Sequence, residues 1–187
     1  MEEKFILIWE KAKPYLKKGI RKNFILHTKC VIEAVRLILK AENMINDNLI
    51  IAAILHDVGW ANVPNNIQLS KDRDIVHEGM KLHLEYSKPI IRDILSSIKY
   101  SNNFIETIID IVISHKFCKP KEIEKKLLID ADTLSDVFKE QFYSDCSSYN
   151  LSPVELYEHR KKNTFYTNSA RSIFYYELDN RKNEIFK

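Results

Sequence analysis

The sequence contains few of the residues that interrupt helices. Its 187 residues include only three glycines and five prolines, which argues for long, uninterrupted helices over a fold of strands and turns. Long apolar runs are also missing: the longest, residues 49–55, is far too short to cross a bilayer. The chain is nevertheless long enough for one domain with a substantial core.

Cysteine is scarce as well. Cys30, Cys118 and Cys146 are odd in number, far apart and form no Cys-x-x-Cys motif. This pattern favours reduced thiols over a disulfide framework. The start of the chain, Met-Glu-Glu-Lys, lacks the basic segment that opens a signal peptide. We therefore expect a cytoplasmic protein with no membrane segment.

The charge balance excludes one class of partner. The formal net charge is +3, and 45% hydrophobic with 29% charged residues is ordinary for a globular protein. So small a charge does not indicate a partner that is a nucleic-acid polymer. It would not repel a small anionic substrate.

Apolar periodicity predicts helices along the whole chain. A segment that is apolar nearly all round, residues 48–57, is expected at the centre of the bundle, and residues 58–70 are expected to form a loop. No repeat or clear linker is present, so the sequence predicts one all-α domain over 1–187. The expected helices cover about 2–18, 24–42, 48–57, 71–86, 88–99, 104–116, 121–142, 153–162 and 168–179.

Metal-competent side chains stand at the ends or on the apolar stripes of these helices. His56 and Asp57 end the apolar segment 49–55, where two polar groups are costly unless something binds to them. The other candidates are His27, His77, His115 and Asp132. Imidazole and carboxylate ligands suit borderline or hard divalent ions such as Mn, Fe, Co, Ni, Zn or Mg. Soft metals prefer thiolate ligands instead.

Three segments, taken in order, resemble the HD-domain metal-dependent phosphohydrolase superfamily. His27-Thr28 resembles the first histidine segment, and residues 52–59, AAILHDVG, resemble the signature. Trp60 stands where a lysine often follows the signature glycine. Residues 129–134, IDADTL, resemble the closing aspartate segment, in which the Ala-Asp-x-Leu pattern fits Asp132. The resemblance covers roughly residues 20–140, and the helices of about 152–180 would pack on that core.

The resemblance implies an HD-type helical bundle that holds one or two divalent metal ions. It assigns the ligands of one ion to His27, His56, Asp57 and Asp132. Relatives with two metals add histidines between the signature and the last aspartate. His77 and His115 occupy the appropriate places, and Asp57 would then bridge both ions.

The implied reaction is hydrolysis of a small phosphorylated substrate such as a nucleotide. Asp57 is expected among the catalytic residues. His77 or His115, when it is not a ligand, could act as an acid or base because imidazole titrates near neutrality. Lys116 and Arg73 are expected to hold a phosphate, Arg73 bidentately.

Other interpretations remain open. Some relatives use six such ligands in a di-iron site for oxygenation, and a non-catalytic module that binds a metal or ligand is a third possibility. Cys30 with His27 and Cys118 with His115 could build a structural zinc site, but this leaves His56 and Asp57 unexplained.

Several further polar residues have no assigned ligand role. His83 lies six residues from His77, about 240° round a helix. It is therefore interpreted as a surface residue, as is His159. Asp130, Asp136 and Glu78 either orient ligands or are exposed to solvent.

Overall fold

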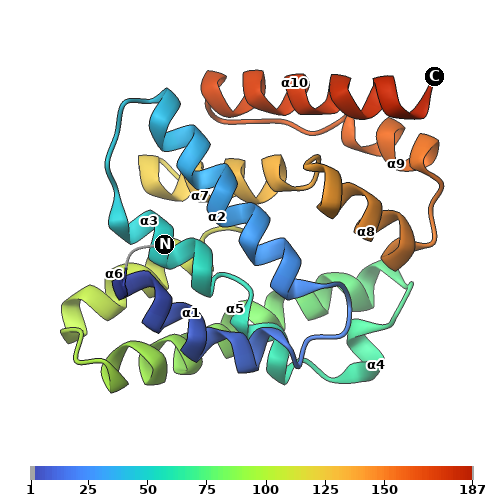
Figure 1. Cartoon of the computed structure of the whole chain (residues 1–187). Coiled ribbons are helices and arrows are strands. Elements are labelled where there is room, and N and C mark those ends of the chain that lie inside the picture. Colours follow the sequence, from blue (N-terminus) through green and yellow to red (C-terminus); the bar gives the residue numbers. More distant parts are fainter. Residues whose placement is uncertain (1–2, 187) are drawn as a thin grey trace.

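The computed structural model describes residues 3–186, and every regular element within that range is helical (Figure 1). This confirms the prediction of an all-α fold. No helix of the described range combines the length and apolar character needed to span a bilayer. The elements are α1 (Glu3–Leu16), α2 (Phe24–Ala41), α3 (Asp47–Leu55), the 3-10 helix η1 (Val58–Asn62), α4 (Asn65–Gln68), α5 (Arg73–Ser97), α6 (Asn102–Ile113), α7 (Ile123–Ser135), α8 (Lys139–Tyr149), α9 (Pro153–Arg160) and α10 (Asn168–Ile185).

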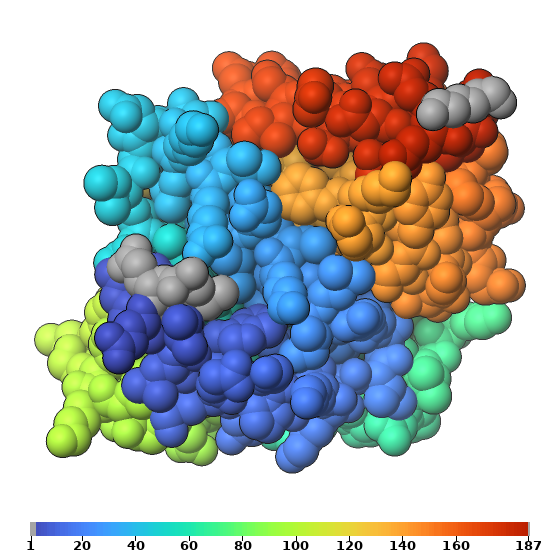
Figure 2. Space-filling model, in the orientation of Figure 1, coloured from blue at the N-terminus to red at the C-terminus, as the bar shows by residue number. Residues whose placement is uncertain are grey.

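α2 runs through the middle of the bundle and packs against α3 and α7 (Figure 1). Figure 2 shows it between α1 and α10 on one face of the molecule. Its buried stripe starts at Phe24 and His27 and continues to Ile38 and Leu39. All of Ile51–Leu55 in α3 is buried, as expected for a central helix. Because α2 begins and α3 ends inside the bundle, the polar residues at these two ends lie in its interior.

α5 differs from the prediction. The sequence predicts two helices, with the second opening at Lys88-Pro89, but one helix continues from Arg73 to Ser97 with Pro89 inside it. Proline removes only one backbone hydrogen bond, the one to the carbonyl of Glu85, and Glu85 is exposed to solvent, which can hydrate that carbonyl. Burial of Leu84 before the proline and Ile91 after it keeps the helix in one piece.

The prediction of one helix over residues 121–142 is also wrong. α7 ends at Ser135 and α8 begins at Lys139, with Phe138 in an extended conformation between them. Arg160 of α9 forms ion pairs with Asp136 at the break, at 2.8 Å, and with Asp145 of α8, at 2.6 Å. One guanidinium therefore pairs with both carboxylates and fixes the orientation of α8 relative to α7.

The segment 58–70, expected as a loop, contains η1 and α4 instead. η1 lies directly on α5 at Gly59. A Cβ atom added to Gly59 would sit 1.9 Å from the carbonyl oxygen of His83 and 2.7 Å from the backbone nitrogen of Ser87. Only glycine allows this approach, and the approach places Asp57 beside His83.

Candidate metal centre

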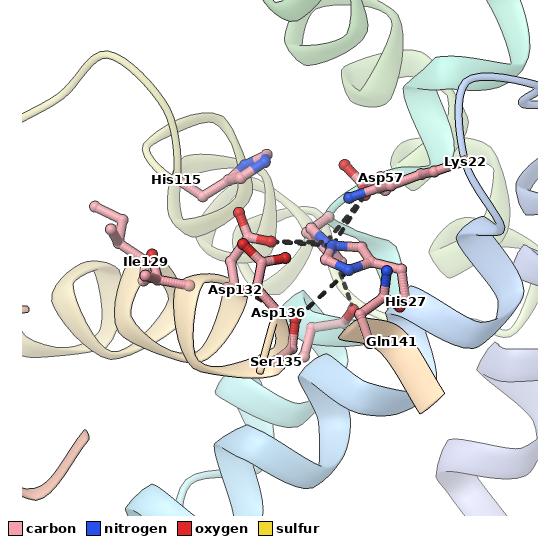
Figure 3. Close-up of polar contacts among 12 residues, drawn as sticks. Lys22, His27, Asp57, His115, Ile129, Asp132, Ser135, Asp136 and Gln141 are labelled. Carbon is pink, nitrogen blue, oxygen red and sulfur yellow. Dashed lines mark hydrogen bonds and ion pairs between the residues drawn. The ribbon is translucent and has the colours of Figure 1, made fainter. Parts of the chain in front are cut away.

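Four residues from three parts of the chain meet in the interior. His27 lies in the first turn of α2, His56 and Asp57 follow α3, and Asp132 projects from α7 (Figure 3). His27 Nε2 lies 3.0 Å from Asp132 Oδ1 and 3.5 Å from Asp57 Oδ2. His56 Nε2 lies 3.2 Å from Asp57 Oδ2 and 3.9 Å from Asp132 Oδ1. The structure therefore brings together the four residues that the sequence assigns to one metal ion.

A second group shares Asp57 with the first. His83 Nε2 lies 3.7 Å from Asp57 Oδ1 and 3.4 Å from His115 Nε2. In each of the two groups, His27–His56–Asp57 and Asp57–His83–His115, the potential ligand atoms lie within 4.8 Å of one another. The two carboxylate oxygens of Asp57 face different histidines, as a ligand shared by two ions requires.

The interpretation of His83 as a surface residue is wrong, because His83 is fully buried in this second group. His77 is exposed, with its ring against Phe117, and does not join either group. The sequence carried a signal for His83 that the prediction overlooked. Its spacing from Gly79, Ser87 and Ile90 matches the buried stripe of α5. The 240° between His77 and His83 is correct, but His83 is the residue that faces the core.

Two of the histidines use Nδ1 for a backbone hydrogen bond and turn Nε2 toward the centre. His56 Nδ1 donates to the carbonyl of Ala53 at 2.8 Å, and His115 Nδ1 donates to that of Val112 at 2.5 Å. In the neutral form, each therefore keeps a lone pair on Nε2. His56 Nε2 is buried without a hydrogen-bond partner. A buried acceptor without a donor fits a cation at this point, so the residues suit a divalent metal.

The surroundings keep the carboxylates ionised. Burial would raise the pKa of Asp57, but His56 and Lys22 outweigh it and hold that pKa well below its usual value. Burial would likewise raise the pKa of Asp132, but Lys116 and His27 lower it well below the ordinary range. Ionised carboxylates are the form that binds metal.

Most of the imidazoles are held neutral. Burial lowers the pKa of His83 to about 4. Burial, and next the charge of Lys116, holds the pKa of His115 well below its ordinary value, and burial also lowers the pKa of His27. The pKa of His56 is raised instead, because the carboxylate of Asp57 outweighs the effect of burial. Neutral imidazole is the form that coordinates a metal.

A cavity of about 190 Å³ opens over the carboxylates. Lys22 Nζ lies 3.7 Å from Asp57 Oδ2 (Figure 3), and Lys116 forms an ion pair with Asp132. Arg21 and Arg160 also line the cavity. Lys116, which is predicted from the sequence to hold a phosphate, lines this cavity, whereas Lys22, Arg21 and Arg160 have no counterpart in the sequence prediction.

Arg73 does not reach this cavity. It lies with His77 and His159 in a separate cleft of about 840 Å³. Arg21, Met80 and Tyr149 line both the cavity and the cleft, so the two are neighbours. The predicted phosphate contact of Arg73 therefore does not fall at the metal-binding groups.

The remaining acidic candidates have separate environments. Asp130 is buried and accepts hydrogen bonds from the backbone nitrogens of Tyr166 and Thr167, both at 2.8 Å, which fixes the start of α10. Asp136 lines the cavity and forms an ion pair with Arg160, which also lines it. Glu78 is exposed. Neither metal-competent group in the described residues includes a cysteine, which leaves the zinc alternative without support.

The fold agrees with the comparisons. The family model described as HD domain matches residues 24–136, so the chain belongs to the HD domain family. This confirms the resemblance drawn from the sequence. A crystal structure described as a predicted HD superfamily hydrolase from an uncultured Thermotogales bacterium is similar over 96% of this chain and 85% of that one, with 20% identity and a TM-score of 0.59. No curated protein matches the sequence significantly.

Proposed function

We propose that the protein is a divalent-metal-dependent phosphohydrolase that acts on a small phosphorylated substrate such as a nucleotide. The observation that carries this proposal is the pair of ligand groups joined at Asp57, beneath a cavity lined by cationic side chains. Membership of the HD domain family and the fold shared with a predicted HD superfamily hydrolase support the hydrolase class.

In this proposal His27, His56, Asp57 and Asp132 would hold one ion, and Asp57, His83 and His115 a second. His83 replaces His77 in the ligand set. Bound metal would lower the pKa of a coordinated water and polarise a phosphoryl oxygen. Trp60 donates a hydrogen bond from Nε1 to Asp57 Oδ1 at 3.2 Å. Its ring also stacks on that of His83, with the ring centroids 4.8 Å apart, so Trp60 orients both residues.

The cations around the cavity would bind the phosphate. Lys22 and Lys116 already pair with the two metal-binding carboxylates, and Arg21 completes a basic wall. Such groups stabilise the charge that develops on phosphoryl oxygens. At about 190 Å³ the cavity is smaller than usual pockets for whole ligands, about 300–1,000 Å³, so it suits the phosphate. The adjoining cleft has room for the rest of a nucleotide.

Metal analysis of purified variants, combined with activity on p-nitrophenyl phosphate and nucleoside monophosphates, tests the proposal. Asp57→Asn should abolish binding of both ions, and His83→Gln should remove one ion. His77→Gln is the matched control and should leave the metal content unchanged. Metal-loaded protein without phosphatase or phosphodiesterase activity would refute the proposal. Iron-loaded protein that consumes oxygen with an organophosphonate or polyol would favour the oxygenase alternative.

A further inference from the structure

The charged residues that line the cleft beside the metal cavity are all basic. Arg21, Lys71 and Arg73 line it together with His77 and His159, and no aspartate or glutamate belongs to its lining. Asp74 and Glu78 lie on the same helix as Arg73 but outside the lining. A concave surface with one sign of charge concentrates ligands of the opposite sign.

These cations have no acidic partner. Within residues 3–186, neither Lys71 nor Arg73 forms an ion pair, and Arg21 donates to the backbone carbonyl of Gln68 at 3.3 Å. By contrast, Lys22 and Lys116 in the metal cavity each pair with a carboxylate. The charge of the cleft is therefore available to an external anion. Guanidinium groups bind phosphate with two parallel hydrogen bonds when the geometry allows.

The cleft and the metal cavity are connected along one helix. Arg73, Met80 and His83 all project from α5, where Arg73 and Met80 line the cleft and His83 belongs to the second ligand group. Arg73 and His83 are ten residues apart, which is about 15 Å along the helix axis. Met80, Arg21 and Tyr149 line both spaces, so they mark the passage between them. A ligand that spans this passage can place one end at the metals and the other at Arg73.

The apolar side chains of the cleft suit the middle of such a ligand. Leu69, Val76 and Met80 contribute to its walls, and Tyr149 offers a ring at the passage. Ligand sites typically combine apolar walls with a few convergent polar groups. A nucleoside has the mixed character that these walls would accept.

We propose that the cleft binds a second phosphate group of the substrate, so that the preferred substrates are nucleosides that carry phosphates at two positions. The proposal rests on the proposed function, since it takes the metal cavity as the place of the first phosphate. Arg73 and Lys71 are then specificity-determining residues and take no part in the bond cleavage. The sequence prediction of a phosphate contact at Arg73 thus moves from the reacting phosphate to the distant one.

Two nucleotides that differ only by the second phosphate test this proposal. Adenosine 5′-monophosphate and adenosine 3′,5′-bisphosphate are compared on the full-length, metal-containing protein. Calorimetric titration gives Kd where no turnover occurs, and initial rates give KM where it does. The bisphosphate should bind at least tenfold more tightly. The double substitution of Lys71→Gln with Arg73→Gln should bring the ratio close to one and leave KM and kcat for p-nitrophenyl phosphate unchanged.

The matched control removes the same charges elsewhere. Arg36 and Lys40 are exposed on α2 and line neither space, so Arg36→Gln with Lys40→Gln should keep the full ratio. A ratio near one in the unaltered protein, or a ratio that survives loss of Lys71 and Arg73, would overturn the proposal. If the ratio behaves as expected but no metal-dependent hydrolysis is found, the proposed function fails and the second phosphate site stands.

Discussion

Replacing Gly59 by alanine perturbs the contact that sets η1 against α5. The new Cβ atom would lie 1.9 Å from the carbonyl oxygen of His83, 2.6 Å from Ser87 Oγ and 2.7 Å from the backbone nitrogen of Ser87. Real Cβ atoms essentially never approach another heavy atom closer than 3.0 Å, so the two elements would have to separate by about 1 Å. Two of the three neighbours are backbone atoms, which cannot rotate away as the end of a side chain can.

Overpacking of a core usually costs about 1–3 kcal/mol, and the backbone contacts put Gly59→Ala at or above the upper end, about 3 kcal/mol. The reduced entropy of the unfolded chain returns less than about 1 kcal/mol of this. At about 2–4 °C per kcal/mol for a chain of this length, the net cost of about 2–3 kcal/mol should lower Tm by about 4–12 °C. Urea and thermal unfolding in the presence of a chelator measure this effect without a contribution from bound metal.

Gly79→Ala is the matched control. Its Cβ would lie 2.8 Å from the Cγ2 methyl of Ile67, which belongs to a side chain and not to the backbone. Alanine is also about 1 kcal/mol more favourable than glycine inside a helix, so this variant should remain within about 1 kcal/mol of the unaltered protein. The reasoning would be refuted if Gly59→Ala unfolded within about 0.5 kcal/mol of the unaltered protein, or if the two variants lost equal stability.

Two further predictions concern residues outside the ligand groups. Gln68 is buried; it accepts from the backbone nitrogen of Ile20 at 2.9 Å and donates to the carbonyls of Trp60 and Val63 at 3.0 and 2.8 Å. Gln68→Ala should therefore cost about 2–3 kcal/mol in urea unfolding, whereas Asn66→Ala on the exposed side of α4 should cost less than about 0.5 kcal/mol. Burial raises the pKa of Cys30 to about 11, and Cys118 is exposed, so a thiol reagent at pH 8 should label native Cys118 first. Rapid labelling that persists in Cys118→Ser, measured by mass spectrometry, would contradict this assignment.

Three of the four residues in the first group lie in local patterns of the sequence, and the fourth, Asp132, comes from the family resemblance. His27 begins an amphipathic stripe, and His56 and Asp57 end an apolar segment. The position of His83 relative to His77 does not reveal its burial, because His77 faces outward from α5. Gly79, Ser87 and Ile90 give the correct face, and they could have been read from the spacing alone.

Other features depend on contacts between distant parts of the chain. The break between α7 and α8 accompanies the pairing of Asp136 and Asp145 with Arg160, 15 residues beyond Asp145. The cleft combines Arg21, residues 68–80 and residues 148–159. Helix periodicity gives the face of each helix but not which faces meet, so neither feature could be predicted from the sequence.

The distribution of the ligand residues has a consequence for folding. His27 and Asp132 are 105 positions apart and touch at 3.0 Å, and His56, His83 and His115 come from three further places between them. In the unfolded chain, bringing these residues together costs loop-closure entropy. An ion that binds only the folded form would stabilise the whole bundle. It would add about 2.7 kcal/mol to the free energy of unfolding at a free concentration 100 times its Kd. Metal supply in the cell would then govern how long the protein survives proteolysis as well as whether it is active.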